Sequence, residues 1–229
     1  MLMRRKNKLN KRSVITMSEP KSINSEQYRT IRTNIEFSSI DTEVKSLIIT
    51  SAGPEEGKST TAANLAVVFA QQGKKVLLVD ADLRKPTVHF TFKLDNGIGL
   101  TSLLLKQMPF KEAVLPSGEA NLDILTSGPI PPNPAELLST KTMKDVLAEA
   151  GAIYDKVIVD TPPVLAAADT KILGSYTDGS IMVISSGKTD KEKAAKAKEA
   201  LVSCRSKLIG AVMNGKKQTK HSDCAYYGH

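Results

Sequence analysis

The chain has 229 residues, of which 41% are hydrophobic and 24% charged, a balance typical of a folded protein rather than a disordered one. Its longest apolar runs are about six residues, whereas a membrane helix needs ~20, so we expect no membrane span. Most of the net charge of +8 lies in residues 1–21, where seven cations accompany one anion. We therefore expect a basic arm at residues 1–21, which either binds anionic lipid or nucleic acid or stays solvated.

A short amphipathic helix is predicted directly after the arm. Asn24 or Ser25 is a suitable N-cap, and Tyr28, Ile31 and Ile35 then recur on one face with helical spacing. Glu26, Arg29 and Arg32 occupy an adjoining face of this helix.

From residue 45 onward, short apolar runs alternate with helical patterns. Strands are predicted at residues 46–50, 75–79, 122–126, 156–159, 181–185 and 208–213. Helices are predicted at residues 58–72, 99–106, 134–150, 166–176 and 191–205. Several strands are apolar at consecutive positions, as strands covered on both faces are. The pattern predicts the α/β class, with a doubly wound, mostly parallel sheet.

A phosphate-binding loop lies between the first of these strands and the helix that follows it. Its residues are Ala52-Gly53-Pro54-Glu55-Glu56-Gly57-Lys58-Ser59. Gly57 allows a tight turn in which successive amides face a phosphate at a helix N-terminus. In such loops the lysine reaches the β- and γ-phosphates and the following hydroxyl binds Mg²⁺, which assigns these roles to Lys58 and Ser59.

Two carboxylate motifs follow at predicted strand ends. Asp80 and Asp82 come after one apolar run, and Asp160 comes after another. The carboxyl ends of parallel strands line the ligand crevice, so these carboxylates are expected near the loop. Asp160 is then interpreted as the Walker B carboxylate that holds the metal directly or through water.

Together these residues resemble the bacterial protein-tyrosine kinases associated with capsular or exopolysaccharide synthesis. That family combines a phosphate loop, an apolar run followed by Asp-x-Asp-x-Arg, and a Walker B run followed by Asp-x-x-Pro. Residues 52–59, 77–84 and 157–163 match the three motifs in order. A preceding Glu-x-x-Arg-x-x-Arg helix is matched by Glu26, Arg29 and Arg32. The resemblance covers residues 24 to about 215 and implies a P-loop NTPase fold.

The resemblance implies transfer of the ATP γ-phosphate to tyrosine, with Mg²⁺ as cofactor. Lys58 would hold phosphate, Ser59, Asp82 and Asp160 would bind or orient Mg²⁺, and Asp80 would orient or deprotonate the tyrosine hydroxyl. Such positioning and charge neutralisation are the main requirements of phosphoryl transfer. The residues expected to contact the nucleotide are Gly53, Pro54, Glu55, Glu56, Gly57, Lys58, Ser59, Thr60 and Asn214, although Asn214-Gly215 is also a plausible turn.

The family also implies partners. It suggests a ring-like homo-oligomer formed through Glu26, Arg29 and Arg32, which can equally be a solvated helix face. It further suggests activation by the cytosolic segment of a separate transmembrane polysaccharide-synthesis adaptor. We therefore expect a cytoplasmic protein, recruited to the inner face of the membrane, that acts on protein tyrosines and has no specific nucleic-acid partner.

The expected organisation has three parts. The basic arm at 1–21 precedes a kinase domain at 22–215 and a flexible tail at 216–229. The tail carries Tyr226 and Tyr227, which we predict to be autophosphorylation sites. Family tails usually carry a larger tyrosine cluster, so the short pair is a departure from the pattern.

Two other functions remain open from the sequence. A partitioning or division-site ATPase would share the loop and both carboxylate motifs, but its loop carries an additional lysine where this chain has Gly53. A non-enzymatic scaffold in polysaccharide export, with an ATP site that controls only assembly, is the second alternative.

Overall fold

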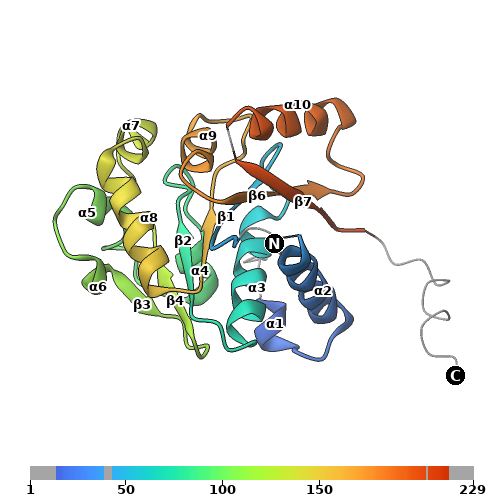
Figure 1. Cartoon of the computed structure of the whole chain (residues 1–229), viewed down its shortest axis with the longest axis horizontal. Helices are drawn as coiled ribbons and strands as arrows, with labels where there is room; N and C mark the ends of the chain where they lie inside the picture. The colour runs from blue at the N-terminus through green and yellow to red at the C-terminus, as the bar shows by residue number, and fades with distance from the viewer. Residues whose placement is uncertain (1–13, 39–42, 205, 217–229) are drawn as a thin grey trace, which may run out of the picture.

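The structure, a computed structural model, describes residues 14–38, 43–204 and 206–216. Seven strands form one sheet in the order β3-β4-β2-β5-β1-β6-β7 (Figure 1). The strands are β1 (Ser46–Ser51), β2 (Val76–Asp80), β3 (Val114–Pro116), β4 (Leu122–Leu125), β5 (Lys156–Asp160), β6 (Gly179–Ser185) and β7 (Lys207–Asn214). All neighbouring pairs are parallel except β3 and β4 at one edge.

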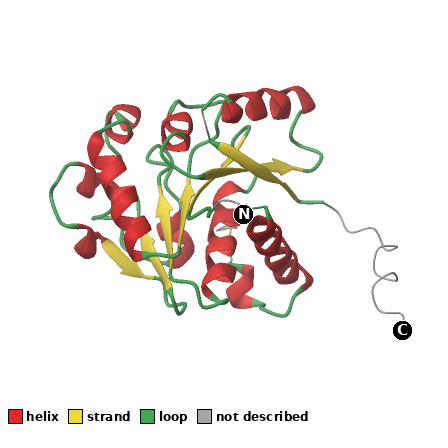
Figure 2. Ribbon diagram, in the orientation of Figure 1, coloured by secondary structure: helices red, strands yellow, loops and turns green. Residues whose placement is uncertain are grey.

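Ten helices are assigned within the described ranges, and they surround the sheet (Figure 2). They are α1 (Ile15–Ser18), α2 (Ile23–Phe37), α3 (Lys58–Ala70), α4 (Val88–Phe92), α5 (Leu100–Leu104), α6 (Phe110–Ala113), α7 (Pro134–Leu138), α8 (Lys141–Ile153), α9 (Asp169–Gly174) and α10 (Lys191–Val202). None of these helices is both long and apolar enough to cross a membrane.

The two faces of the sheet carry separate hydrophobic cores, because successive side chains of a strand point to opposite faces. Leu47 and Ile49 of β1 pack with α3 and with residues from α2 and α4. Ile48, between them, packs on the other face with residues from α5 to α10. Strands covered on both faces are apolar at nearly every position, which confirms the predicted doubly wound parallel sheet.

All six predicted strands are present, and the differences from the sequence analysis concern short elements. The single helix predicted at 134–150 is two helices, α7 and α8. The chain turns between them at Ser139 and at Thr140, which has an extended backbone and donates its hydroxyl to the Leu137 carbonyl. Strand β3 was not predicted, since its three residues include Pro116 and are too few to show a period.

The N-terminal segment differs from the expected arm. Residues 14–21 were assigned to the arm, but Val14 and Thr16 are buried, and Thr16 donates its backbone N–H and its hydroxyl to Asn64 of α3. The N-cap of α2 is Ser22, whose hydroxyl accepts from the Ser25 amide, rather than the predicted Asn24 or Ser25. The cationic residues 4–12 lie outside the described part.

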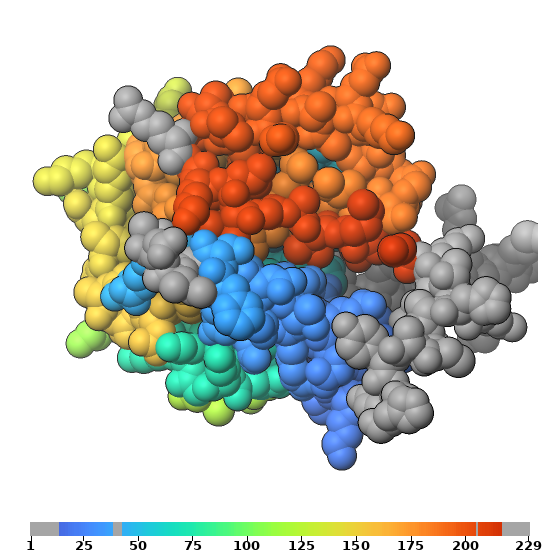
Figure 3. Space-filling model, turned by 45° about the vertical axis from the view of Figure 1, so that its right-hand side comes forward, coloured from blue at the N-terminus to red at the C-terminus, as the bar shows by residue number. Residues whose placement is uncertain are grey.

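Figure 3 shows the face where late elements of the chain lie next to the early helix α2. The red and orange segments, β7 and α10, lie above blue α2. Strand β7 is the other edge of the sheet and packs near both helices. Its last residue, Asn214, therefore reaches the carboxyl edge of the sheet, where β1 also ends.

Two loops cross at the carboxyl end of β4. Asn96 donates to the Gly128 carbonyl and accepts from the Gly128 amide, and the Leu100 amide donates to the Thr126 carbonyl. The backbones approach so closely at Gly99 that any Cβ there would overlap the Gly128 nitrogen and the Thr126 oxygen. The crossing thus fixes the loop before α5 beside the loop after β4.

The substitution Gly99→Ala is expected to lower the free energy of unfolding by about 1–3 kcal/mol, because the neighbours in conflict are backbone atoms. The matched control is Gly151→Ala in α8, where a Cβ meets nothing within 4 Å and alanine should stabilise the helix by ~1 kcal/mol. Urea unfolding of both variants measures the difference. Equal effects would contradict the close crossing.

Candidate functional site

The phosphate loop leaves β1 and opens α3, as predicted. Gly57 is the N-cap of α3 with φ of +95°, a left-handed conformation that glycine adopts at no steric cost. The Glu56 carboxylate accepts a hydrogen bond from the Gly53 amide at 3.1 Å, and the Ser51 hydroxyl donates to the Gly53 carbonyl at 2.7 Å. The side chains of Ser51 and Glu56 therefore fix the loop backbone at Gly53 before α3 begins.

The last strand also contacts this loop. Asn214 Nδ2 donates to the Glu56 carbonyl at 3.0 Å, and the side chain packs against Gly57. Sequence analysis placed Asn214 at the nucleotide but gave no contact with the loop itself. Pro54, Glu55 and Thr60 are exposed around the loop.

Two carboxylates contact Lys58 and a third lies beside them, close to the loop as the sequence analysis expects. Asp80 and Asp160 end β2 and β5, which are adjacent strands with these two residues in register. The Lys58 ammonium lies 2.8 Å from Asp82 Oδ2 and 3.4 Å from Asp160 Oδ1. It also donates to the Ser59 hydroxyl at 3.1 Å. The lysine, the hydroxyl and the carboxylates therefore form one cluster at the carboxyl edge of the sheet.

Burial determines the charge balance of this cluster. Burial opposes the Lys58 charge, but Asp160 and Asp82 outweigh it and raise the pKa of the ammonium. Burial raises the pKa of Asp160, while Lys58 acts in the opposite direction. Burial and the neighbouring Asp160 charge raise the pKa of Asp80 to about 7. The carboxylates of Asp80, Asp82 and Asp160 outnumber the single cation of Lys58, so the site favours further positive charge.

Comparison with known proteins identifies the family. A family model described as an AAA domain matches residues 44–190. The tyrosine-protein kinase YwqD of Bacillus subtilis (strain 168) is 70% identical over 217 residues, covering 95% of this chain and 92% of that protein. The chain belongs to the bacterial tyrosine-protein kinase family. The kinase is also 39% identical to the putative tyrosine-protein kinase CapB of Staphylococcus aureus, over 91% of this chain and 92% of that protein.

Solved structures agree with this assignment. The chimerical protein CapA2B2 is 42% identical and superposes with a TM-score of 0.87 over 90% of each chain. The kinase domain of Escherichia coli tyrosine kinase ETK is 33% identical, with a TM-score of 0.85 over 94% of this chain and 84% of that one. The septum site-determining protein MinD from Pyrococcus horikoshii, solved with Mg-ADP, shares the fold at 21% identity and a TM-score of 0.66.

The residues expected to hold Mg²⁺ in the kinase fit such an ion. Ser59, Asp82 and Asp160 provide a hydroxyl and carboxylates, the hard oxygen ligands that Mg²⁺ prefers. Asp160 Oδ2 is buried without a hydrogen-bond partner among the described residues. The other oxygen of this carboxylate, Oδ1, lies 3.4 Å from the Lys58 ammonium. A buried acceptor without a donor is costly, and a cation at this point would relieve the cost.

One residue of the site was missed by the sequence analysis. The Arg84 guanidinium binds the fully buried Asp169 through two parallel hydrogen bonds, Nε to Oδ2 at 2.8 Å and Nη2 to Oδ1 at 3.0 Å. The next residue, Thr170, donates its hydroxyl to the Pro162 carbonyl. This bidentate pair therefore joins the turn after Asp82 to the segment after Asp160. Asp169 has no local motif, so only its distance to Arg84 reveals it.

The helix α2 presents part of its motif to solvent. Glu26 and Arg29 form an exposed ion pair one turn apart. Arg32 instead donates to the Val68 carbonyl of α3 at 3.0 Å and lies near Glu36. Arg32 thus links α2 to α3, the helix that the phosphate loop opens.

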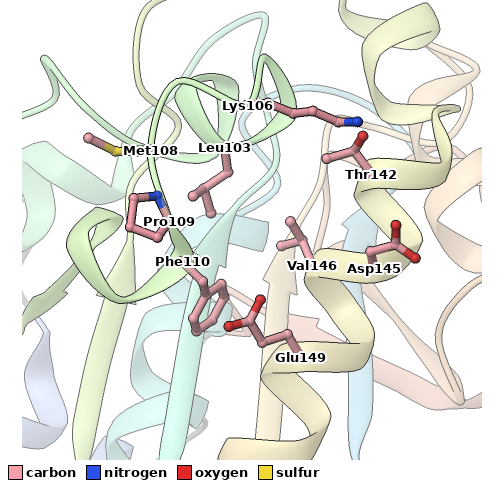
Figure 4. A pocket seen from close by; sticks show the side chains of 9 residues that line it. All are labelled: Leu103, Lys106, Met108, Pro109, Phe110, Thr142, Asp145, Val146 and Glu149. Carbon is pink, nitrogen blue, oxygen red and sulfur yellow. The ribbon is translucent and has the colours of Figure 1, made fainter.

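A pocket of about 240 Å³ lies between α5–α6 and α8 and is separate from this cluster (Figure 4). Its apolar side chains, such as Leu103, Phe110 and Val146, are flanked by Asp145 and Glu149. No residue of the phosphate loop or of the carboxylate motifs lines it.

Gly57→Ala is expected to abolish measurable ATP binding, because alanine at φ +95° is strained and its Cβ would overlap Asn214 Nδ2. The control is Gly73→Ala after α3, which has φ of +92° but nothing within 4 Å of a Cβ. That control should lose stability but keep its ATP affinity. Isothermal titration with ATP and Mg²⁺ compares them, and equal ATP affinities in both variants would contradict the assigned role of Gly57.

Proposed function

We propose that the kinase uses Mg²⁺ and ATP to phosphorylate tyrosines of its own tail, and that it regulates capsule or exopolysaccharide synthesis together with a membrane adaptor. The cluster of Lys58, Ser59, Asp82 and Asp160 is the observation that carries the proposal. It joins a phosphate-binding loop to carboxylates that neutralise and orient a magnesium nucleotide.

In the proposed reaction, the tyrosine oxygen attacks the γ-phosphorus while the bond to the β–γ bridging oxygen breaks and ADP leaves. The hydroxyl proton passes to Asp80, whose raised pKa suits a base near neutrality. Ser59, Asp82 and Asp160 would hold Mg²⁺, which would supply neutralisation of the phosphate charges. Lys58 releases the carboxylates and binds the phosphates when nucleotide enters.

The tyrosines of the described residues are poor candidates for the phosphate acceptor. Within the described residues none of the three tyrosines is exposed. Tyr154 is buried and donates its hydroxyl to the Asp123 carboxylate, while Tyr28 and Tyr176 are partly buried. Tyr226 and Tyr227 lie outside the described residues. They are therefore the proposed acceptors.

The adaptor, the ring and the location complete the proposal. Glu26 and Arg29 on α2 offer exposed charges for a neighbouring subunit, with Arg32 holding that helix to α3. The cytosolic segment of a transmembrane adaptor would activate the kinase at the inner face of the membrane.

The first test is incubation with γ-labelled ATP, Mg²⁺ and the adaptor's cytosolic segment, followed by phosphoamino-acid analysis. Label on tyrosine is expected, and Lys58→Met should abolish it. Tyr226→Phe with Tyr227→Phe should remove most of the self-labelling while transfer to an added tyrosine polymer persists. Free phosphate without labelled protein would instead favour the partitioning-type ATPase. Assembly with neither labelled protein nor free phosphate would favour the scaffold.

Asp80 allows a sharper test, because its carboxylate also accepts hydrogen bonds from the Thr87 and Val88 amides at 2.9 Å. Asp80→Asn keeps an acceptor oxygen for these amides but removes the base. It should lower kcat by about 10²–10⁴-fold at nearly unchanged ATP affinity.

Asp80→Ala is the matched comparison, since it also releases both amides and should lower the melting temperature. If Asp80→Asn retains wild-type kcat, Asp80 serves only to hold the turn before α4.

A further inference from the structure

Three exposed apolar residues lie in segments that follow the neighbouring strands β2 and β4 at the carboxyl edge of the sheet. Among the large hydrophobic residues of the described chain, Phe90 is 70% exposed, Ile130 62% and Ile98 45%. Each follows a strand that ends at this edge: Phe90 follows β2, Ile130 follows β4, and Ile98 lies in the loop fixed to the end of β4. We call these three residues the β2–β4 rim.

Backbone contacts hold the β2–β4 rim close to the reaction centre. Helix α4 carries Phe90. Its first residue, Val88, donates its amide to Asp80 Oδ2, which ties the start of the helix to the end of β2. The Ile98 carbonyl accepts from the Thr126 hydroxyl at 2.8 Å, and Ile130 lies two residues beyond the Gly128 crossing. The rim is therefore built on fixed backbone rather than on a free loop.

The strand order assigns this rim to the attacking side of the reaction. The phosphate loop follows β1, and β5 and then β2 separate β1 from β4. In the proposed reaction the loop would hold the phosphates on the leaving side, and the γ-phosphate would lie beside the carboxylates that end β5 and β2. In-line transfer requires the acceptor oxygen opposite the leaving oxygen. An acceptor must therefore approach from the β2 and β4 side, where the rim lies.

We propose that Phe90, Ile98 and Ile130 form the surface on which the tyrosine-bearing segment of a protein substrate docks. This rests on the proposed kinase function and adds the acceptor-binding surface to it. A tyrosine ring is apolar apart from its hydroxyl, so an apolar rim can bind the ring while the hydroxyl faces Asp80. Exposed Lys85, in the turn that follows Asp82, adds positive charge, which favours acidic residues near the tyrosine.

The test measures phosphate transfer to poly(Glu,Tyr), an acidic tyrosine copolymer, by Phe90→Ser and Ile130→Ser. The KM for the copolymer is expected to rise roughly ten-fold in each, the size expected when one large apolar contact is lost, while the KM for ATP remains at the wild-type value. Val202→Ser on α10 is the matched control, since Val202 is 58% exposed and α10 follows β6, on the other side of β1 from β2 and β4. Its KM values should not change.

Binding without transfer separates docking from catalysis. In the Lys58→Met background, fluorescently labelled copolymer should bind more weakly once Phe90→Ser is added. If the rim variants and the Val202→Ser control have equal KM values and affinities for the copolymer, the docking role of the rim is refuted. The proposed kinase function would remain intact. A change in subunit mass by light scattering with unchanged copolymer KM would also overturn it, since a second copy would then cover the rim. Absence of tyrosine labelling by the wild type would overturn the proposed function itself.

Discussion

The contact between the Lys58 ammonium and the carboxylates of Asp82 and Asp160 is the interaction around which the site is organised. A lysine and two aspartates with so little exposure are stable only as a group, because each charge alone would be costly to bury. The group requires that β1, β2 and β5 end together. The parallel central sheet supplies that condition, and its two apolar cores hold the strand ends in place.

In the proposed function, this contact between Lys58 and the carboxylates would have to open for nucleotide to bind. Lys58 neutralises carboxylates that we propose to bind Mg²⁺, so phosphate and metal would have to enter together if neither charge is to be left unpaired. The Arg84–Asp169 pair limits the freedom of the carboxylates during this exchange. It joins the turn after Asp82 to the chain after Asp160 by two charged hydrogen bonds on a buried carboxylate.

Much of this arrangement could be predicted from the sequence, and the reason is local. The runs around Leu77–Val79 and Val157–Val159 identify buried strands, and the aspartates that follow them must then meet at one edge. The rest depends on contacts between distant segments. Neither the burial of Thr16 on Asn64 nor the pairing of Arg84 with Asp169 has a periodic signal, and the division of α7 from α8 depends on the hydroxyl and backbone of Thr140.

The contact of Asn214 with Glu56 and Gly57 also has a consequence for synthesis of the protein. The phosphate loop begins at residue 52, but the side chain that supports its backbone belongs to the last strand, 158 residues from Glu56. During translation the loop and its helix leave the ribosome long before that strand. A nascent chain therefore carries the lysine and the aspartates without the support of Asn214, and the complete nucleotide loop forms only after residue 214 has emerged.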